Sequence, residues 1–350
     1  MPLLALAGCA SIGPATVPRD RIGYLAAVGE SWKEQTLLNI VRLRYGDAPT
    51  FLDVSSIISG YGLQGQLSAG GQVSSDRTNT IPSALATLGA TGSYLDRPTI
   101  SYTPLSGQKF TTSLLRPIPP TAVFELIQAG YPADFILLVT TRAVNGVFNR
   151  SSMGGVSRSA DAAFYPLLDA LRRLQLSGTV SLRREKRGPD EIVHLVLAGS
   201  RSAEVERDLR AVREALGARP DAQGEMTLAF GAVPRGDNEI AVLSRSMMEI
   251  LLEIALGIDV PADHVTQGRT GASARAIEAE DPRDRPLVRV LAGPERPADA
   301  FAAVRHRDSW YWIDDRDYRS KRVLSVLMLF FSLAETGVTP QAPLLTVPAN

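Results

Sequence analysis

Residues 57–103 alternate between apolar and polar side chains with a period of two. From Ile57 to Val73 the apolar residues occupy odd positions, and Gly, Ser and Gln fill the even ones. From Ser83 to Thr103 the parity is reversed. Because successive side chains of a strand point to opposite faces, this pattern predicts two strands, each with one apolar and one polar face.

The reversal of parity predicts that the two strands pair as one long hairpin, at about residues 53–103. A polar stretch, Ser74–Thr80, separates them. If the turn is centred near Arg77 and Thr78, Tyr61 faces Tyr94 and Leu67 faces Leu88. All the apolar positions then lie on one face of the hairpin.

The rest of the chain follows the usual periods of helices and strands. Residues Arg19–Tyr45 are expected to form one or two helices, with a stop at Gly46–Pro49. Further helices are expected at Thr121–Gln128, Phe135–Val147, Ala162–Leu176, Ala203–Leu216, Glu239–Leu256 and Arg319–Ala334. The β-branched residues of Phe135–Val147 leave the assignment of that segment open. Further strands are expected at Val180–Arg184, Ile192–Leu197, Met226–Phe230, Leu287–Leu291 and Ala302–Ile313.

The predicted fold class is therefore α+β, with an N-terminal helix, a long amphipathic two-stranded β-hairpin and a mixed α/β C-terminal region. The expected domain organisation assigns the helix and hairpin to residues 19–110. An α+β globular domain follows at residues 111–350.

Composition narrows the possible functions. The chain has 350 residues, 45% of them apolar, which is normal for a protein with a hydrophobic core. Lys+Arg and Asp+Glu both number 37, so no basic surplus is present. A general nucleic-acid binder needs such a surplus to neutralise phosphates, and we expect no nucleic-acid partner.

The single cysteine, Cys9, follows the run Leu6-Ala7-Gly8. This run resembles the lipobox of bacterial lipoproteins, in which an apolar signal segment is cut before the cysteine and its thiol is lipidated. Residues 1–8 would then be the remnant of a longer signal peptide, because eight residues without a basic one are too few for a complete leader. Residues 9–18 would form a flexible tether. The alternative is an apolar N-terminus with a cysteine there by chance.

The lipobox resemblance implies a location. In that family Asp after the cysteine retains the protein at the inner membrane, and here Ala10 stands at that position. The expectation is an outer-membrane lipoprotein that mainly faces the periplasm. The stretch Trp32–Pro49 also resembles sequence segments of uncharacterised proteobacterial lipoproteins. This resemblance implies no function.

Catalytic and cofactor motifs are not found in the sequence, which lacks a Walker loop, a dinucleotide fingerprint, GxSxG and paired metal-binding histidines. We predict no catalytic residue, no cofactor and no metal. The carboxylates of Asp314, Asp315 and Asp317 cluster beside Trp312 and could hold a hard cation. Ion pairing with the Arg and Lys residues that follow is the favoured interpretation, and Asp317 could also cap the closing helix.

The hairpin carries the main functional hypothesis. From Tyr61 to Val73 it rises ~40 Å at ~3.3 Å per residue, which gives ~30 Å of height at a tilt of roughly 40°. That height suffices for the ~25 Å apolar band of an outer membrane. Because two strands cannot close a barrel, several copies would have to contribute hairpins to one barrel. Lipoproteins of the curli-export type build a ring channel from the hairpins of many protomers in this way. The similarity is one of architecture and not of sequence.

This hypothesis assigns the two faces of the hairpin. The membrane-facing residues would be Tyr61, Leu63, Leu67, Leu88 and Tyr94. The lumen-facing residues would be Gln64, Gln66, Gln72, Thr87 and Thr91. The protein would then be a homo-oligomer that serves export or envelope assembly. A second possibility for the hairpin is that its apolar face lies on protein.

Two other functions stay open. A monomeric periplasm-facing adaptor could bind polysaccharide or a protein partner through a surface that comprises Trp310, Tyr311, Trp312, Asp314 and Asp315, since aromatic rings with polar tips suit such contacts. Core packing, with the two tryptophans on one face of a strand and Tyr311 on the other, is the alternative for these aromatic residues. The third function is an enzyme of unrecognised type.

Overall fold

The computed structural model describes residues 12–74, 83–152, 158–187, 190–199, 202–219, 225–273 and 281–334. The chain divides into two compact units. The first comprises the described residues up to Glu30 together with Leu52–Pro104. The second comprises Ser31–Phe51 and the described residues from Leu105 onward. Helices and strands are both abundant, which confirms the α+β class.

The N-terminal helix α1 spans Ile12–Arg44 and contributes residues to both units. It therefore begins seven residues before the expected start at Arg19, and the part of the predicted tether that is described, Ile12–Pro18, is helical. Pro14 is tolerated because it lies in the first turn, where amide groups have no helical acceptor. Pro18 lies inside the helix and removes one amide donor.

A six-stranded sheet forms the centre of the second unit, in the order β6-β5-β10-β9-β8-β7. Its strands are β5 (Thr141–Val144), β6 (Val147–Phe148), β7 (Val180–Arg187), β8 (Asp190–Leu197), β9 (Glu225–Phe230) and β10 (Glu239–Ser244). Neighbours are antiparallel except for β9 and β10, which are parallel. The predicted strands at β7, β8 and β9 are confirmed, and β7 and β8 pair as a hairpin.

The predicted helix Phe135–Val147 is wrong in its second half. Helix α4 (Ala133–Thr140) ends, and the chain continues as β5, a turn and β6. Asn145 and Gly146 form the turn with φ of 47° and 79°, the left-handed backbone that a two-residue hairpin requires. Asn-Gly is the strongest short-range hairpin signal in a sequence, so this turn could have been predicted from the sequence.

The predicted helix Glu239–Leu256 is wrong in its first half, which is the strand β10. Helix α7 (Met247–Leu256) begins only after the cap residue Ser246. The Ser246 hydroxyl accepts from the Glu249 amide, and the Glu249 carboxylate accepts from the Ser246 amide. This reciprocal capping box fixes the start of the helix, and the S-x-x-E spacing signals it in the sequence.

The remaining helices follow the predictions closely. They are α3 (Pro120–Gln128), α5 (Phe164–Leu176), α6 (Ala203–Leu216) and α9 (Tyr318–Ala334). Two short helices, α2 (Gly107–Phe110) and α8 (Ala262–Thr266), were not expected. Gly217 ends α6 in the left-handed conformation with φ of 58°.

A second, antiparallel sheet contains β11 (Leu291–Gly293), β13 (Ser309–Asp314) and β12 (Ala300–His306), in that order. The expected strand at Leu287–Leu291 is wrong, since only Leu291 belongs to β11. Leu287, Val288 and Val290 are buried without being in a strand. A short apolar run in the sequence predicts burial, but it does not determine the backbone conformation.

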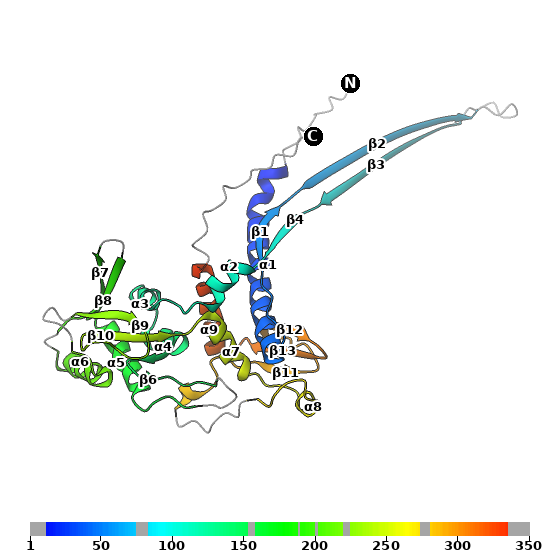
Figure 1. Ribbon diagram of the computed structural model, residues 1–350. Coiled ribbons are helices and arrows are strands. Elements are labelled where there is room, and N and C mark those ends of the chain that lie inside the picture. Colours follow the sequence, from blue (N-terminus) through cyan, green and yellow to red (C-terminus); the bar gives the residue numbers. More distant parts are fainter. Residues whose placement is uncertain are drawn as a thin grey trace. The chain divides into compact units, whose positions relative to one another are not determined.

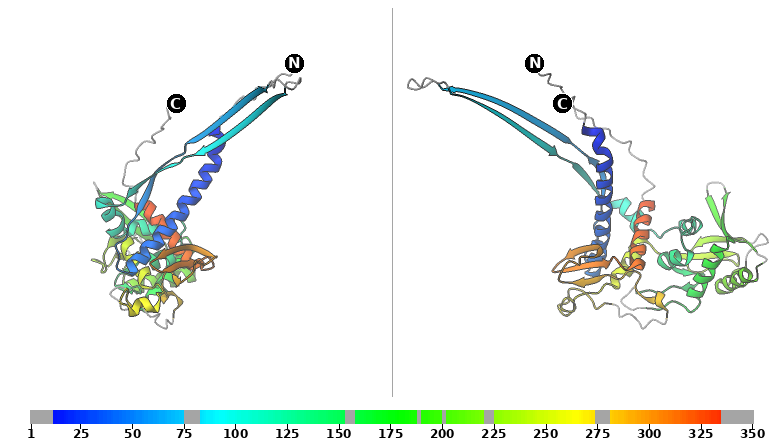
Figure 2. Two further views of the ribbon diagram at one scale, coloured as in Figure 1. Left: turned by 90° about the vertical axis from the view of Figure 1, so that its right-hand side faces the viewer. Right: turned by 180° about the vertical axis from the view of Figure 1, so that it is seen from behind.

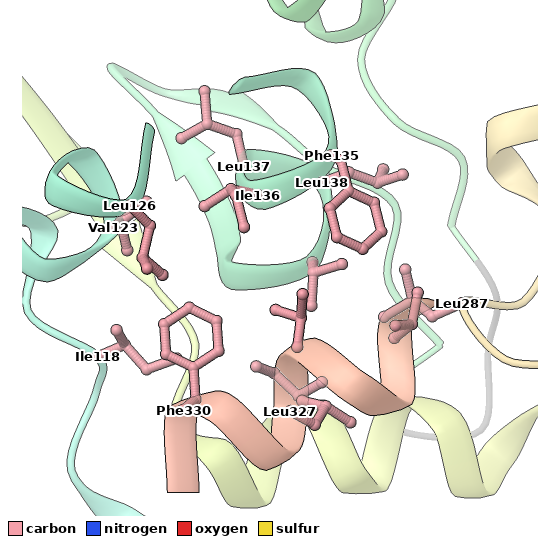
Figure 3. Packing of buried hydrophobic residues seen from close by; sticks show 14 of the residues in the cluster. Ile118, Val123, Leu126, Phe135, Ile136, Leu137, Leu138, Leu287, Leu327 and Phe330 are labelled. Atoms are coloured by element: carbon pink, nitrogen blue, oxygen red, sulfur yellow. The ribbon is translucent and has the colours of Figure 1, made fainter. Parts of the chain in front are cut away.

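The described hydrophobic core lies in the second unit (Figure 3). Phe330 of α9 points toward Ile118 and toward Val123 and Leu126 of α3. Ile136, Leu137 and Leu327 are fully buried. Burial of such side chains contributes about 1.5–3 kcal/mol each relative to exposure. The described buried core includes no residue of the first unit, so the described side chains of the hairpin contribute nothing to it.

Candidate functional site

The hairpin in the first unit consists of two antiparallel ladders (Figures 1 and 2). Strand β1 (Leu52–Ile58) pairs with β4 (Thr99–Pro104), and β2 (Tyr61–Ser74) pairs with β3 (Ser83–Asp96) over fourteen positions. The expected extent of the hairpin is confirmed. The ladders are separated at Pro98, which has no amide to donate. The Arg97 amide still donates to the Gly60 carbonyl at 2.9 Å, and this bond holds the strands together at the gap.

A bulge in β1 keeps the apolar residues on one face. Ile57 lies opposite Ile100, whereas Val54 lies opposite Tyr102, with a shift of one residue between Val54 and Ser56. Because of the extra residue, the apolar positions of β1 change from even numbers at Val54 to odd numbers at Ile57. Without the bulge, Val54 would point to the polar face, because a one-residue slip inverts every side chain.

The predicted register of β2 and β3 is wrong by two residues. Tyr61 lies opposite Asp96, not Tyr94, and Leu67 lies opposite Ala90, not Leu88. A shift of two preserves the faces, since the side-chain period is two, so the apolar positions still share one face. The pattern of small Ala, Gly and Ser residues offers few cross-strand contacts that distinguish registers related by two residues.

Both faces of the paired strands include exposed side chains. Ala69 and Ala90 on the apolar face are exposed, and so are Gln64, Gln66 and Thr91 on the polar face. The side chains of Leu63, Leu67, Leu88, Tyr94, Gln72 and Thr87 lie outside the described ones, although their backbone belongs to the ladder. For the described side chains, the hairpin thus presents an amphipathic ribbon with neither face covered.

Tyr61, predicted to face the membrane, forms a hydrogen bond with α1 that was not predicted. Its hydroxyl donates to the Asp20 carboxylate of α1. This hydrogen bond lowers the pKa of Asp20 and raises the pKa of Tyr61. The Ser59 hydroxyl also donates to the Tyr24 hydroxyl at 3.4 Å. Tyr61 therefore ties the base of the hairpin to α1 through its polar tip.

The aromatic strand β13 has one inner and one outer face. Tyr311 is fully buried, whereas Trp310 and Trp312 are half-buried. The alternation predicted from the sequence is confirmed, and it removes Tyr311 from the proposed partner surface. The Arg296 guanidinium lies 5.4 Å from the Trp310 ring centre. Of the predicted partner surface, Trp310, Trp312, Asp314 and Asp315 remain at least partly exposed.

The carboxylates at the end of β13 and just after it form local hydrogen bonds and ion pairs. The Asp314 carboxylate accepts from the Arg316 amide at 2.8 Å, and Asp315 pairs with Lys321 at 2.6 Å. Asp317 accepts from the Ser320 amide at 3.1 Å, which caps α9 as the sequence suggested. Among the residues described, no His, Cys, Asp or Glu group has a geometry suited to a metal.

A buried network around Tyr45 was missed by sequence reasoning. The Tyr45 hydroxyl lies 2.5 Å from His264 Nδ1 and hydrogen-bonds to the Tyr311 hydroxyl. All three side chains are at most 7% exposed. Burial raises the pKa of Tyr311, so its hydroxyl stays protonated at neutral pH. The residues are far apart in sequence, and none stands in a motif that could have predicted the contact.

His306 lies beside this network. Its ring centre is 5.2 Å from that of Tyr45, and its Nε2 lies 3.3 Å from the Asp47 carboxylate. Burial lowers the pKa of His306, partly offset by Asp47. Although His264 and His306 are far apart in the sequence, the fold brings both to Tyr45. Within the described residues the cluster is enclosed, which suits a structural polar network better than a catalytic cleft.

No protein-family model, curated protein or solved structure matches the chain. The predicted lipidation site Cys9 and residues 1–8 lie outside the described residues. In the part of the chain that is described, no helix has both the length and the apolar character needed to cross a bilayer.

Proposed function

We propose that the chain is a lipid-anchored outer-membrane envelope protein that oligomerises, and that its hairpin contributes to a shared barrel or channel for export or envelope assembly. The lipid on Cys9 would hold it to the membrane, mainly facing the periplasm. No catalytic residue or cofactor is needed. The observation that carries the proposal is the ladder of β2 and β3.

The backbone amide and carbonyl groups along the outer edges of the ladder are not joined to another described strand. Among the described strands, β2 and β3 pair only with each other. Such edges pair readily with further strands. Hairpins of neighbouring copies would satisfy these groups and close the ribbon into a barrel, the one form in which strands can cross a bilayer.

The stability of the hairpin also favours a partner. A two-stranded hairpin is marginally stable in water by itself. The described side chains on both faces of β2–β3 are largely exposed, and the core of the second unit includes none of them. Strand pairing with other copies and contact between the apolar face and lipid would supply the missing stabilisation.

Matched arginine substitutions on the two faces test the proposal. Ala69→Arg places a charge on the lipid face, which costs about 2–4 kcal/mol near the bilayer midplane, whereas Gln66→Arg faces water. We expect Ala69→Arg to abolish channel conductance in planar bilayers. We expect Gln66→Arg to leave insertion intact and to shift ion selectivity toward anions. Equal behaviour of the two variants would contradict the proposal.

The adaptor function remains a second candidate because of one observation. Trp310 and Trp312 are half-buried on the outer face of β13, and Arg296 stacks against Trp310. Partly exposed tryptophans beside an arginine are enriched where proteins bind partners. A Trp310→Ala, Trp312→Ala double variant that loses a periplasmic partner or polysaccharide while channel conductance persists would favour this candidate.

A further inference from the structure

A cavity of about 270 Å³ lies in the second unit, apart from the hairpin and from the Tyr45 network. We call it the η1 pocket, after the π-helix η1 (Thr111–Leu115) that forms one wall. It is lined by Thr112, Ser113, Arg116, Pro117, Ile118, Pro119, Ala122, Met247 and Phe330. These residues come from η1, the proline-rich segment that follows, α3, α7 and α9.

The backbone around the pocket has an unusual conformation. The Arg116 amide donates to the Thr111 carbonyl at 3.1 Å, the i to i+5 bond of a π-helix. Such turns account for well under 1% of residues and are often found at functional sites. The segment after it is fixed by the Ile118 amide, which donates to the Arg245 carbonyl at 3.0 Å. The wall is therefore held in place from both ends.

The pocket has an apolar floor and a polar rim. Ile118, Met247 and Phe330 are at most 7% exposed, and Figure 3 shows Ile118 beside Phe330. Thr112 and Arg116 are exposed at the rim. Arg116 supplies a positive charge at this rim. One end of the pocket therefore favours carbon chains and the other favours a negative charge.

The size restricts the ligand. Dry apolar cavities of about 150 Å³ bind benzene, so this cavity has room for a chain of several more carbons. It is smaller than the roughly 300–1,000 Å³ of pockets for drug-sized molecules. A single acyl chain of intermediate length fits these limits.

We propose that the η1 pocket binds a single-chain fatty-acid carboxylate, with the chain against the apolar floor and the carboxylate paired with Arg116. Charge complementarity at the rim selects the anion over a neutral or cationic amphiphile. The proposal is independent of the shared-barrel function, since it uses no residue of the hairpin.

Photolabelling of the full chain in digitonin, a detergent without an alkyl chain, tests this site. A diazirine-bearing decanoic acid should label the peptides around 112–122 and 330, with saturation and with competition by decanoate. Arg116→Gln should weaken labelling by the acid about tenfold, the loss expected for one charge-assisted contact of about 1.4 kcal/mol. The corresponding decanol probe should be unaffected by that substitution. Arg219→Gln, which alters an arginine 85% exposed elsewhere in the unit, is the matched control and should change nothing.

A second variant tests occupancy. Ala122→Phe fills the cavity and should abolish labelling by both probes while the circular dichroism spectrum stays native. Labelling by the acid that is unchanged in both Arg116→Gln and Ala122→Phe would overturn the proposal. So would a decyltrimethylammonium competitor that displaces the acid probe as well as decanoate does.

Discussion

Tyr45 is the residue on which the buried polar network depends. Its hydroxyl contacts both His264 and Tyr311, which are nearly inaccessible to water. Tyr45→Phe keeps the ring and removes only the hydroxyl, so two buried polar groups lose a partner. We expect the free energy of unfolding to fall by about 1–3 kcal/mol, measured by urea denaturation.

Tyr102→Phe is the control for this substitution, because Tyr102 is 57% exposed in β4. It should change the unfolding free energy by less than about 0.5 kcal/mol. If Tyr45→Phe and Tyr102→Phe have equal effects, the Tyr45 network does not stabilise the fold.

Single residues show where sequence reasoning reached its limit. Alternation along β13 correctly placed Tyr311 on one face and the two tryptophans on the other. Asp317 could be predicted as a helix cap because its carboxylate accepts from the Ser320 amide, only three residues further along the chain. The contacts of Tyr45 with His264 and Tyr311 join residues 219 and 266 positions apart, and no periodicity encodes such a pairing.

At the scale of elements, helix α7 depends on its capping box. Ser246→Ala removes the hydroxyl that accepts from the Glu249 amide at 3.1 Å. We expect a loss of about 1 kcal/mol in unfolding free energy, measured by thermal or chemical denaturation. Ser106→Ala, at the N-cap of α2 where the side chain makes no capping bond, should have a smaller effect. An equal loss in both variants would show that the capping bonds are not the cause.

The hairpin illustrates what a pattern of period two can and cannot determine. It predicted the strands and their shared apolar face, but the register was two residues off because such a shift changes neither face. The bulge between Val54 and Ser56 was not predicted, although the parity change from Val54 to Ile57 implies an extra residue there. The two misassigned helices carried local signals, Asn145-Gly146 and Ser246–Glu249, that compete with apolar periodicity.

At the scale of the molecule, the two units differ in how they are stabilised. The second unit has the described hydrophobic core, while the first has a long ladder to which no other described strand is joined. A unit built mainly from a two-stranded ribbon gains most from association with other copies. The central claim is therefore that the hairpin drives oligomerisation in a membrane environment.

The oligomeric state of the full-length lipidated protein, extracted in mild detergent, tests this claim most directly. It should be compared by native mass spectrometry with a version that lacks Asp53–Tyr102. The account predicts a discrete ring for the intact protein and soluble monomers for the deletion. Monomers of equal solubility in both samples would contradict it.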